Sequence, residues 1–71
     1  MKNIFINSST IKTISYNIHT RELQVQFKRG AIYNYKCVDY IDVLGIIFSD
    51  SSGYYFNKNV ANNYKYEKVE D

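Results

Sequence analysis

The chain has 71 residues, of which 45% are hydrophobic and 17% aromatic, with neither proline nor tryptophan. This length predicts a single domain, near the lower limit at which a hydrophobic core sustains a fold unaided. Nine basic and seven acidic residues give a net charge of +2, too little for a protein that binds long polyanions by electrostatics alone. The high aromatic content and low net charge also exclude a disordered chain.

The cysteine and histidine content limits the chemistry available to the chain. Cys37 and His19 are the single residues of their types. One cysteine cannot form an intramolecular disulfide, so we expect a reducing, cytoplasmic compartment. The acidic residues are scattered, and we expect neither a metal nor a cofactor. The apolar runs are too short for a signal peptide or a membrane-spanning helix, which predicts no membrane partner.

The first half of the chain has the pattern of β-strands. Residues 10–16 are mostly β-branched or aromatic, and residues 22–27 alternate between apolar and polar side chains. A period of two is typical of an antiparallel strand with one buried face, here the face of Leu23, Val25 and Phe27. The polar segment between these two strands predicts a hairpin loop.

A second hairpin follows directly. Residues 28–30 predict a tight turn, in which Gly30 supplies the positive φ that a bulged hairpin requires. Residues 31–37 then predict a third strand, which completes a meander. Alternate positions of this strand share one face: Ala31, Tyr33, Tyr35 and Cys37.

The period changes to that of a helix after residue 38. Asp39 is the expected N-cap, and Asp42 lies in the first turn, where a carboxylate favours the start of a helix. Gly45 lowers helix stability by about 1 kcal/mol relative to alanine, which indicates a close contact with the sheet. A broad apolar stripe follows the helical period: Tyr40, Ile41, Val43, Leu44, Ile47 and Phe48.

The remaining residues predict a second helix and an edge strand. Residues 49–53 break the first helix, and a short second helix is expected around residues 57–63. Residues 65–69 predict a short strand at the edge of the sheet. The fold class is therefore α+β, with a three- to four-stranded antiparallel meander and two short helices packed on one face.

Several short motifs occur in the order found in a known family. They are Ser8-Ser9-Thr10-Ile11, Tyr16-Asn17, Leu23-Gln24-Val25-Gln26-Phe27, Gly30, Tyr33-Asn34-Tyr35, Val38, Ser52-Gly53-Tyr54-Tyr55-Phe56-Asn57, Val60 and Tyr64. On these motifs the chain resembles the KTSC domain, which is named after the C-terminal domain of some lysyl-tRNA synthetases and also occurs in stand-alone bacterial and phage proteins. The resemblance covers residues 8–69 as one domain, with residues 1–7 as an N-terminal extension and residues 70–71 as a tail.

The resemblance implies a binding function rather than catalysis. The family has no established catalytic activity, and its attachment to a tRNA enzyme suggests RNA binding. The chain departs from the family pattern at three positions, where Asp39 replaces a common proline, Ser15 a glycine and Ala61 an arginine. Loss of that arginine removes a candidate phosphate contact, which weakens the implication of RNA binding.

A Ser–Gly turn is the strongest candidate for a ligand site. Such a turn, running into a helix, presents backbone N–H groups and the positive helix end to an anion. The same segment is equally well explained as a turn between helices with Asn57 as the N-cap. The candidate residues in it are Ser51, Ser52, Gly53, Tyr54, Asn57 and Lys58.

Two further features are candidates for ligand contacts, and each of them also has a purely structural explanation. Tyr33 and Tyr35 share a strand face, where they either stack on nucleic-acid bases or pack in the core. Arg29 at the hairpin tip offers a planar cation for phosphate or for a base, or else it is simply solvated. No residues have the spacing of a catalytic triad or of a carboxylate pair, so we expect a protein that is not an enzyme.

These features favour a module that binds a small, anionic, nucleotide-like ligand. One version is a homo-oligomer with a pocket closed between subunits, as in a phage-type protein that sequesters a nucleotide signal of host defence. The alternative partner is RNA, as the family resemblance suggests. The third interpretation is a protein-interaction module, which exposed aromatic residues on a small core also fit.

Overall fold

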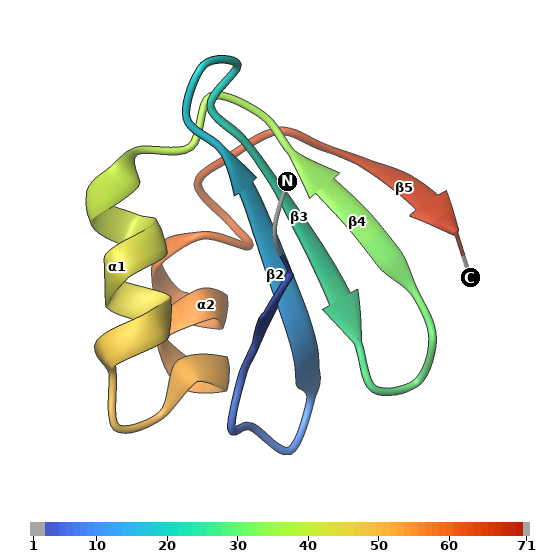
Figure 1. Ribbon diagram of the computed structural model, residues 1–71, viewed down its shortest axis with the longest axis vertical. Helices are drawn as coiled ribbons and strands as arrows, with labels where there is room; N and C mark the ends of the chain where they lie inside the picture. Colours follow the sequence, from blue (N-terminus) through green and yellow to red (C-terminus); the bar gives the residue numbers. More distant parts are fainter. Residues whose placement is uncertain (1–2, 71) are drawn as a thin grey trace.

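The computed structural model describes residues 3–70 and has five strands and two helices. The elements are β1 (Ile4–Phe5), β2 (Ile11–Asn17), β3 (Glu22–Phe27), β4 (Ile32–Tyr35), α1 (Tyr40–Phe48), α2 (Ser52–Asn59) and β5 (Tyr66–Glu70). The strands form one antiparallel sheet in the order of the sequence. Both helices lie on the same side of this sheet (Figure 1). The predicted α+β class and the meander are confirmed.

The sheet has one strand more than the upper end of the prediction. In β1, Ile4 pairs with Ile14 and Phe5 with Thr13 of β2, and the following Ile6 joins the hydrophobic core. Residues 4–6 are therefore part of the fold rather than an extension, and Glu70 belongs to β5. A strand of two residues is too short to show an alternating pattern. Residues 1, 2 and 71 of the expected extension and tail lie outside the described residues.

A β-bulge in β2 decides which side chains of this strand reach the core. Ile11 lies opposite Phe27 and Thr13 lies opposite Gln26, so Lys12 is the extra residue. The bulge shifts the alternation by one position, and Ile11 and Ile14 are both fully buried. Strict alternation would have placed these two isoleucines on opposite faces of the sheet.

Helix α1 begins where the sequence predicts, but the rest of the fold buries less of its apolar stripe than expected. Val43 and Ile46 are buried against the sheet, whereas Tyr40, Ile41 and Phe48 are exposed. Asp39 has the extended backbone of an N-cap, but its side chain makes no capping hydrogen bond. The stripe is thus wider than the surface that the sheet offers to it.

Gly45 makes its close contact with α2 rather than with the sheet, so that expectation is wrong. A Cβ atom at Gly45 would overlap the ring of Tyr55. The Tyr55 hydroxyl donates to Asp42 Oδ1 at 2.9 Å, and the Tyr64 hydroxyl donates to Asp42 Oδ2 at 2.6 Å. The Asp42 carboxylate therefore joins α1 to α2 and to the segment that leads into β5.

Helix α2 begins at Ser52, earlier than the predicted residue 57, which corrects the expected role of Asn57. Its N-cap is Ser51, whose hydroxyl accepts a hydrogen bond from the Tyr54 amide at 3.4 Å. Asn57 therefore lies within the helix. The Ser–Gly segment, which we interpreted as a break, is a helix start because serine is a favoured N-cap and the first turn tolerates glycine.

Candidate functional site

Three segments that are distant in the sequence lie at one end of the molecule. They are the loop before β2, the turn between β3 and β4, and the connection between α1 and α2 (Figure 1). Two pockets of about 380 and 420 Å³ lie there and share Ser9, Thr10 and Asn57, so they form one continuous groove. We call this the Ser/Thr groove; it is lined by residues 7–10, 27–29 and 50–54 and by Asn57.

The loop before β2 is held in place by its own hydroxyl and amide groups. Ser8 Oγ accepts hydrogen bonds from the amides of Thr10 and Ile11, at 3.2 and 3.3 Å. The Lys28 amide donates to the Thr10 carbonyl at 2.8 Å, which ties this loop to the hairpin. The hydroxyl-bearing wall and the basic wall of the groove are therefore fixed relative to each other.

Gly53 allows the start of α2 to approach this loop. A Cβ atom at Gly53 would lie 3.1 Å from Thr10 Oγ1 and 3.3 Å from Ser8 Oγ, both tighter than ordinary van der Waals contacts. The absence of a side chain therefore brings the first turn of α2 against the loop. The first N–H groups of a helix have no acceptor within the helix, so this turn adds donors and a partial positive charge to the groove.

The charges in the groove are unevenly distributed. Lys28 and Arg29 are exposed on one wall, and the Arg29 guanidinium lies 5.6 Å from the centre of the Phe27 ring. Asp50 lines the other part of the groove. Beyond Tyr54, the Lys58 ammonium group lies 5.8 Å from the centre of the exposed Tyr54 ring. Such a groove suits a ligand with an anionic end and a polar or aromatic end.

Most of the predicted site residues come together in this groove. Arg29, Ser51, Ser52, Gly53, Tyr54 and Asn57 line it, and Lys58 lies beside it. The Ser52 hydroxyl is occupied, since it donates to the Ile46 carbonyl at 2.6 Å in a buried position. Ser52 therefore offers its backbone rather than its side chain to a ligand.

The two tyrosines of β4 do not belong to the groove. Tyr35 is only 3% exposed, and burial together with the nearby Tyr66 and Tyr33 raises its pKa to about 12. The ring of Tyr33 is half-buried, edge-on to Phe27 and stacked on Tyr66. For Tyr35, the core alternative of the sequence analysis is the correct one, because the packed ring leaves no face for a ligand.

The sequence interpretation missed the wall formed by the loop before β2. Asn7, Ser8, Ser9, Thr10, Phe27, Lys28 and Asp50 line the groove in addition to the predicted residues. Ser8, Ser9 and Thr10 form a hydroxyl-rich run directly before a strand, which is the one signal that could have indicated them. The sequence does not indicate that Gly53 lies against this run.

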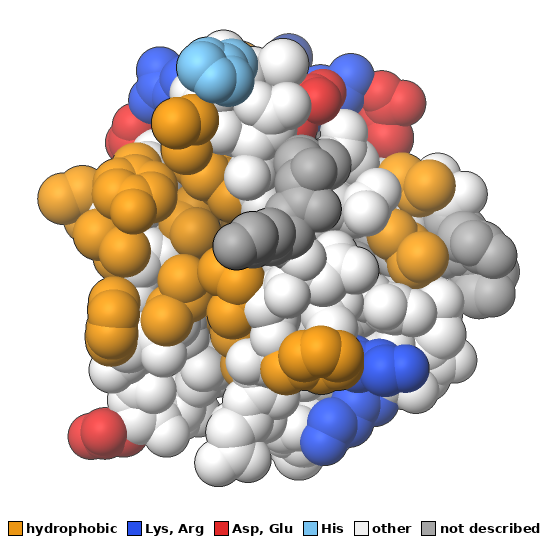
Figure 2. All heavy atoms as spheres, in the orientation of Figure 1, with side chains coloured by type: hydrophobic (Ala, Val, Ile, Leu, Met, Phe, Trp, Pro, Cys, Tyr) orange, Lys and Arg blue, Asp and Glu red, His pale blue; other side chains and the backbone are white. Residues whose placement is uncertain are grey.

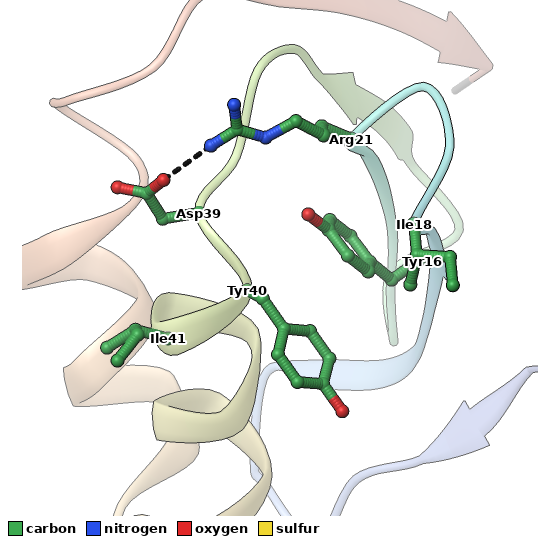
Figure 3. Close-up of a pocket in the computed structure, with 6 residues that line it drawn as sticks. All are labelled: Tyr16, Ile18, Arg21, Asp39, Tyr40 and Ile41. Atoms are coloured by element: carbon green, nitrogen blue, oxygen red, sulfur yellow. Dashed lines mark hydrogen bonds and ion pairs between the residues drawn. The ribbon is translucent and has the colours of Figure 1, made fainter.

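Another pocket, larger than either part of the groove, lies at the start of α1, whereas the groove lies at the end of this helix. Its volume is about 630 Å³, and it is lined by Tyr16, Ile18, Arg21, Asp39, Tyr40 and Ile41 (Figure 3). The Tyr16 hydroxyl donates to the Val38 carbonyl at 2.6 Å. Arg21 Nη2 and Asp39 Oδ1 form an ion pair at 2.5 Å. Because the two charges of this pocket neutralise each other, it offers apolar surface rather than an anion site.

Residues 3–70 contain neither a metal-binding cluster nor a membrane-spanning helix. Among residues 3–70, no group of three or more histidine, cysteine or acidic side chains lies close enough to hold a metal ion. No helix in that same range combines the length and the apolar character needed to span a bilayer.

Comparisons with known proteins agree with the motifs in the sequence. The family model of the KTSC domain matches residues 7–64. An uncharacterized protein of Stutzerimonas stutzeri (strain A1501) is 30% identical over 71 residues, which cover 99% of this chain and 100% of that protein. The crystal structure of a KTSC domain protein from Yersinia pestis matches with a TM-score of 0.88 and 25% identity, over 96% of both chains. The chain belongs to the KTSC domain family.

Proposed function

We propose that the protein binds a small, anionic, nucleotide-like ligand in the Ser/Thr groove. The observation that carries the proposal is the meeting of three walls: a hydroxyl-rich loop, a turn with Lys28 and Arg29, and the first turn of α2. The two parts of the groove, about 380 and 420 Å³, each lie within the range of about 300–1,000 Å³ that is common for small-molecule sites.

Each wall has a chemical role in this proposal. Lys28 and Arg29 bind a phosphate group, because a planar guanidinium group matches its oxygens, and the first amides of α2 donate hydrogen bonds to further oxygens of the ligand. The exposed ring of Tyr54 stacks on the base. Asp50, beside the start of α2, accepts hydrogen bonds from sugar hydroxyls or base amino groups.

A small ligand is a better match than RNA for the arrangement of the charges and rings. Tyr35 is buried, which removes half of the predicted stacking platform on β4. Ala61, where the family commonly has arginine, lies in the turns after α2 and packs partly buried against the core. The groove has two cations on one wall and a carboxylate on the other, whereas long nucleic acids are bound through many phosphate contacts.

Thermal unfolding with a ligand panel tests the proposal. The panel contains inorganic phosphate, nucleoside mono- and diphosphates, cyclic dinucleotides and a single-stranded RNA. A nucleotide of the panel is expected to raise the melting temperature of the wild-type protein, because a ligand that binds only the folded state stabilises it. We expect a shallow dependence of binding on salt, in contrast to the steep dependence of RNA.

The variant Arg29→Ala is expected to lower the affinity about 10-fold or more, as loss of a charge-assisted hydrogen bond does. Lys65→Ala is the matched control, because Lys65 is an exposed cation that does not line the groove. Two results would contradict the proposal: no nucleotide shifts the melting temperature, or Arg29→Ala binds as the control does.

A further inference from the structure

An apolar surface runs along the outer side of α1. We call it the α1 face, and it consists of Tyr40, Ile41, Leu44 and Phe48 together with Ile18 of the neighbouring hairpin. Four of these side chains, all except Leu44, are between 56% and 79% exposed. Figure 2 shows hydrophobic side chains gathered over the position of α1. The helix carries a single charged residue, Asp42, and its carboxylate already accepts two tyrosine hydroxyls.

The α1 face is large for an exposed surface of so small a protein. Aromatic side chains bury about 150–250 Å² each, so two aromatic residues and two isoleucines at these exposures offer on the order of 500 Å². Monomeric proteins rarely expose a contiguous apolar patch above a few hundred Å². A partner in a stable interface contributes about 800 Å², so the α1 face supplies most of the area that a dimer needs.

The two ends of α1 differ in shape. At the start of the helix, the pocket of about 630 Å³ is bordered by Tyr16, Ile18, Tyr40 and Ile41 (Figure 3). At the end of the helix, Phe48 is exposed and projects an aromatic ring from the same apolar face. A pocket and a protruding ring at opposite ends of one helix are complementary only when a second copy runs in the opposite direction.

The charges at the two ends favour the same direction. Arg21 lies at the start of α1 beside Tyr40, and its side chain remains half-exposed although it pairs with Asp39. Asp50 follows the end of α1 and is exposed. An antiparallel arrangement brings Asp50 of one copy to the Arg21–Asp39 pair of the other, where the exposed part of the Arg21 guanidinium faces both carboxylates, and it opposes the helix dipoles favourably. A parallel arrangement would bring the two Asp50 carboxylates together.

We propose that the protein forms a two-fold symmetric dimer in which the α1 faces of two copies pack antiparallel. In this dimer Phe48 of each copy enters the apolar pocket at the start of α1 of the other, and Leu44 lies at the symmetry axis. Such an interface uses the same surface on both copies, as two-fold dimers do. The five residues of the α1 face do not line the Ser/Thr groove, and Asp50 is the one groove residue that lies at the rim of the proposed dimer.

Sedimentation equilibrium over a range of protein concentrations tests the dimer. The wild-type protein is expected to be dimeric, and Phe48→Glu is expected to raise the dimer dissociation constant about 30-fold or more, as loss of a central aromatic contact does. The matched control is Phe5→Glu, because Phe5 is 78% exposed against 79% for Phe48 and pairs across the sheet with Thr13. Circular dichroism verifies that both variants are folded.

Disulfide cross-linking tests the direction of the helices. In a Cys37→Ser background, Leu44→Cys is expected to form a covalent dimer on mild oxidation, because the middle of an antiparallel helix meets its own equivalent. Ser49→Cys, at the end of the helix but outside the α1 face, is expected to remain uncrosslinked, since the ends of the two helices lie apart. A wild-type protein that stays monomeric, a dimer insensitive to Phe48→Glu, or efficient cross-linking through Ser49→Cys would each overturn the proposal.

Discussion

At the scale of single residues, glycines and tyrosines explain how this small sheet and its helices fit together. Gly45 lies in the interior of α1, where glycine is unfavourable by about 1 kcal/mol relative to alanine, and Gly53 lies in the first turn of α2. Each position is crowded by a neighbour, Tyr55 in one case and the loop before β2 in the other. The loss of helix propensity is therefore offset by a close approach between elements.

The variant Gly45→Ala tests this explanation. Helix propensity alone would stabilise the variant by about 1 kcal/mol. The new Cβ atom overlaps the Tyr55 ring, whose hydroxyl is held by Asp42, so the ring has to move and give up its hydrogen bond. We expect the free energy of unfolding in urea to fall by about 1–3 kcal/mol, as in other overpacked sites. A variant that is more stable than the wild type would contradict the contact.

Tyr35 predicts the behaviour of the protein at high pH. Its pKa is raised from 10.0 to about 12, mainly because burial disfavours the charged phenolate. Between these two values the unfolded chain loses the phenolic proton while the folded chain keeps it, so stability decreases as pH rises. We expect the free energy of unfolding of the wild-type protein to fall between pH 10 and 12. The free energy of unfolding of Tyr35→Phe is expected to fall less steeply over the same range. Equal slopes for both proteins would show that Tyr35 does not titrate in this way.

At the scale of elements, the two helices are joined by a carboxylate rather than by apolar contacts alone. Asp42 on α1 accepts hydrogen bonds from Tyr55 on α2 and from Tyr64 in the segment before β5. These hydrogen bonds, followed by desolvation, raise the pKa of both tyrosines. One side chain of the first helix turn thereby connects α1 to α2 and to the segment before β5.

Replacement of this carboxylate by an amide tests its role. Asp42→Asn keeps the size of the side chain but loses the charge that strengthens both hydrogen bonds. We expect a loss of about 1–3 kcal/mol in the free energy of unfolding, together with a decrease in the pKa of Tyr55 and Tyr64 measured by ultraviolet titration. Asp50→Asn is the control, because Asp50 is exposed, and it should leave both quantities unchanged.

At the scale of the whole molecule, the two proposed surfaces are different and border on each other only at the α1–α2 connection. The Ser/Thr groove lies at the end formed by the loop before β2, the β3–β4 turn and the α1–α2 connection (Figure 1). The α1 face extends from that connection to the opposite end, where the pocket of Figure 3 lies. A small domain of this kind can thus bind a ligand and a second copy through sets of side chains that share only Asp50.

Much of the fold was predictable because it depends on local pattern. The alternation of residues 22–27 predicts β3 with its observed bounds, and the helical period after Asp39 predicts α1. The edge strand β5 was also expected. The two-residue β1 and the phase shift at Lys12 were not, because a strand that short has no period and a bulge breaks the period.

By itself, the sequence determined the fold class and the Ser–Gly segment as the candidate site, because both follow from residue types at short spacing, and the order of its motifs carried the resemblance to the family. Only the tertiary structure decided which surfaces are free. It buried Tyr35, turned Phe48 and Ile41 outward, and placed residues 8–10 against Gly53. The reason is physical: the burial of an apolar residue depends on the area that opposing elements cover, and that area is set by contacts between segments far apart in the chain.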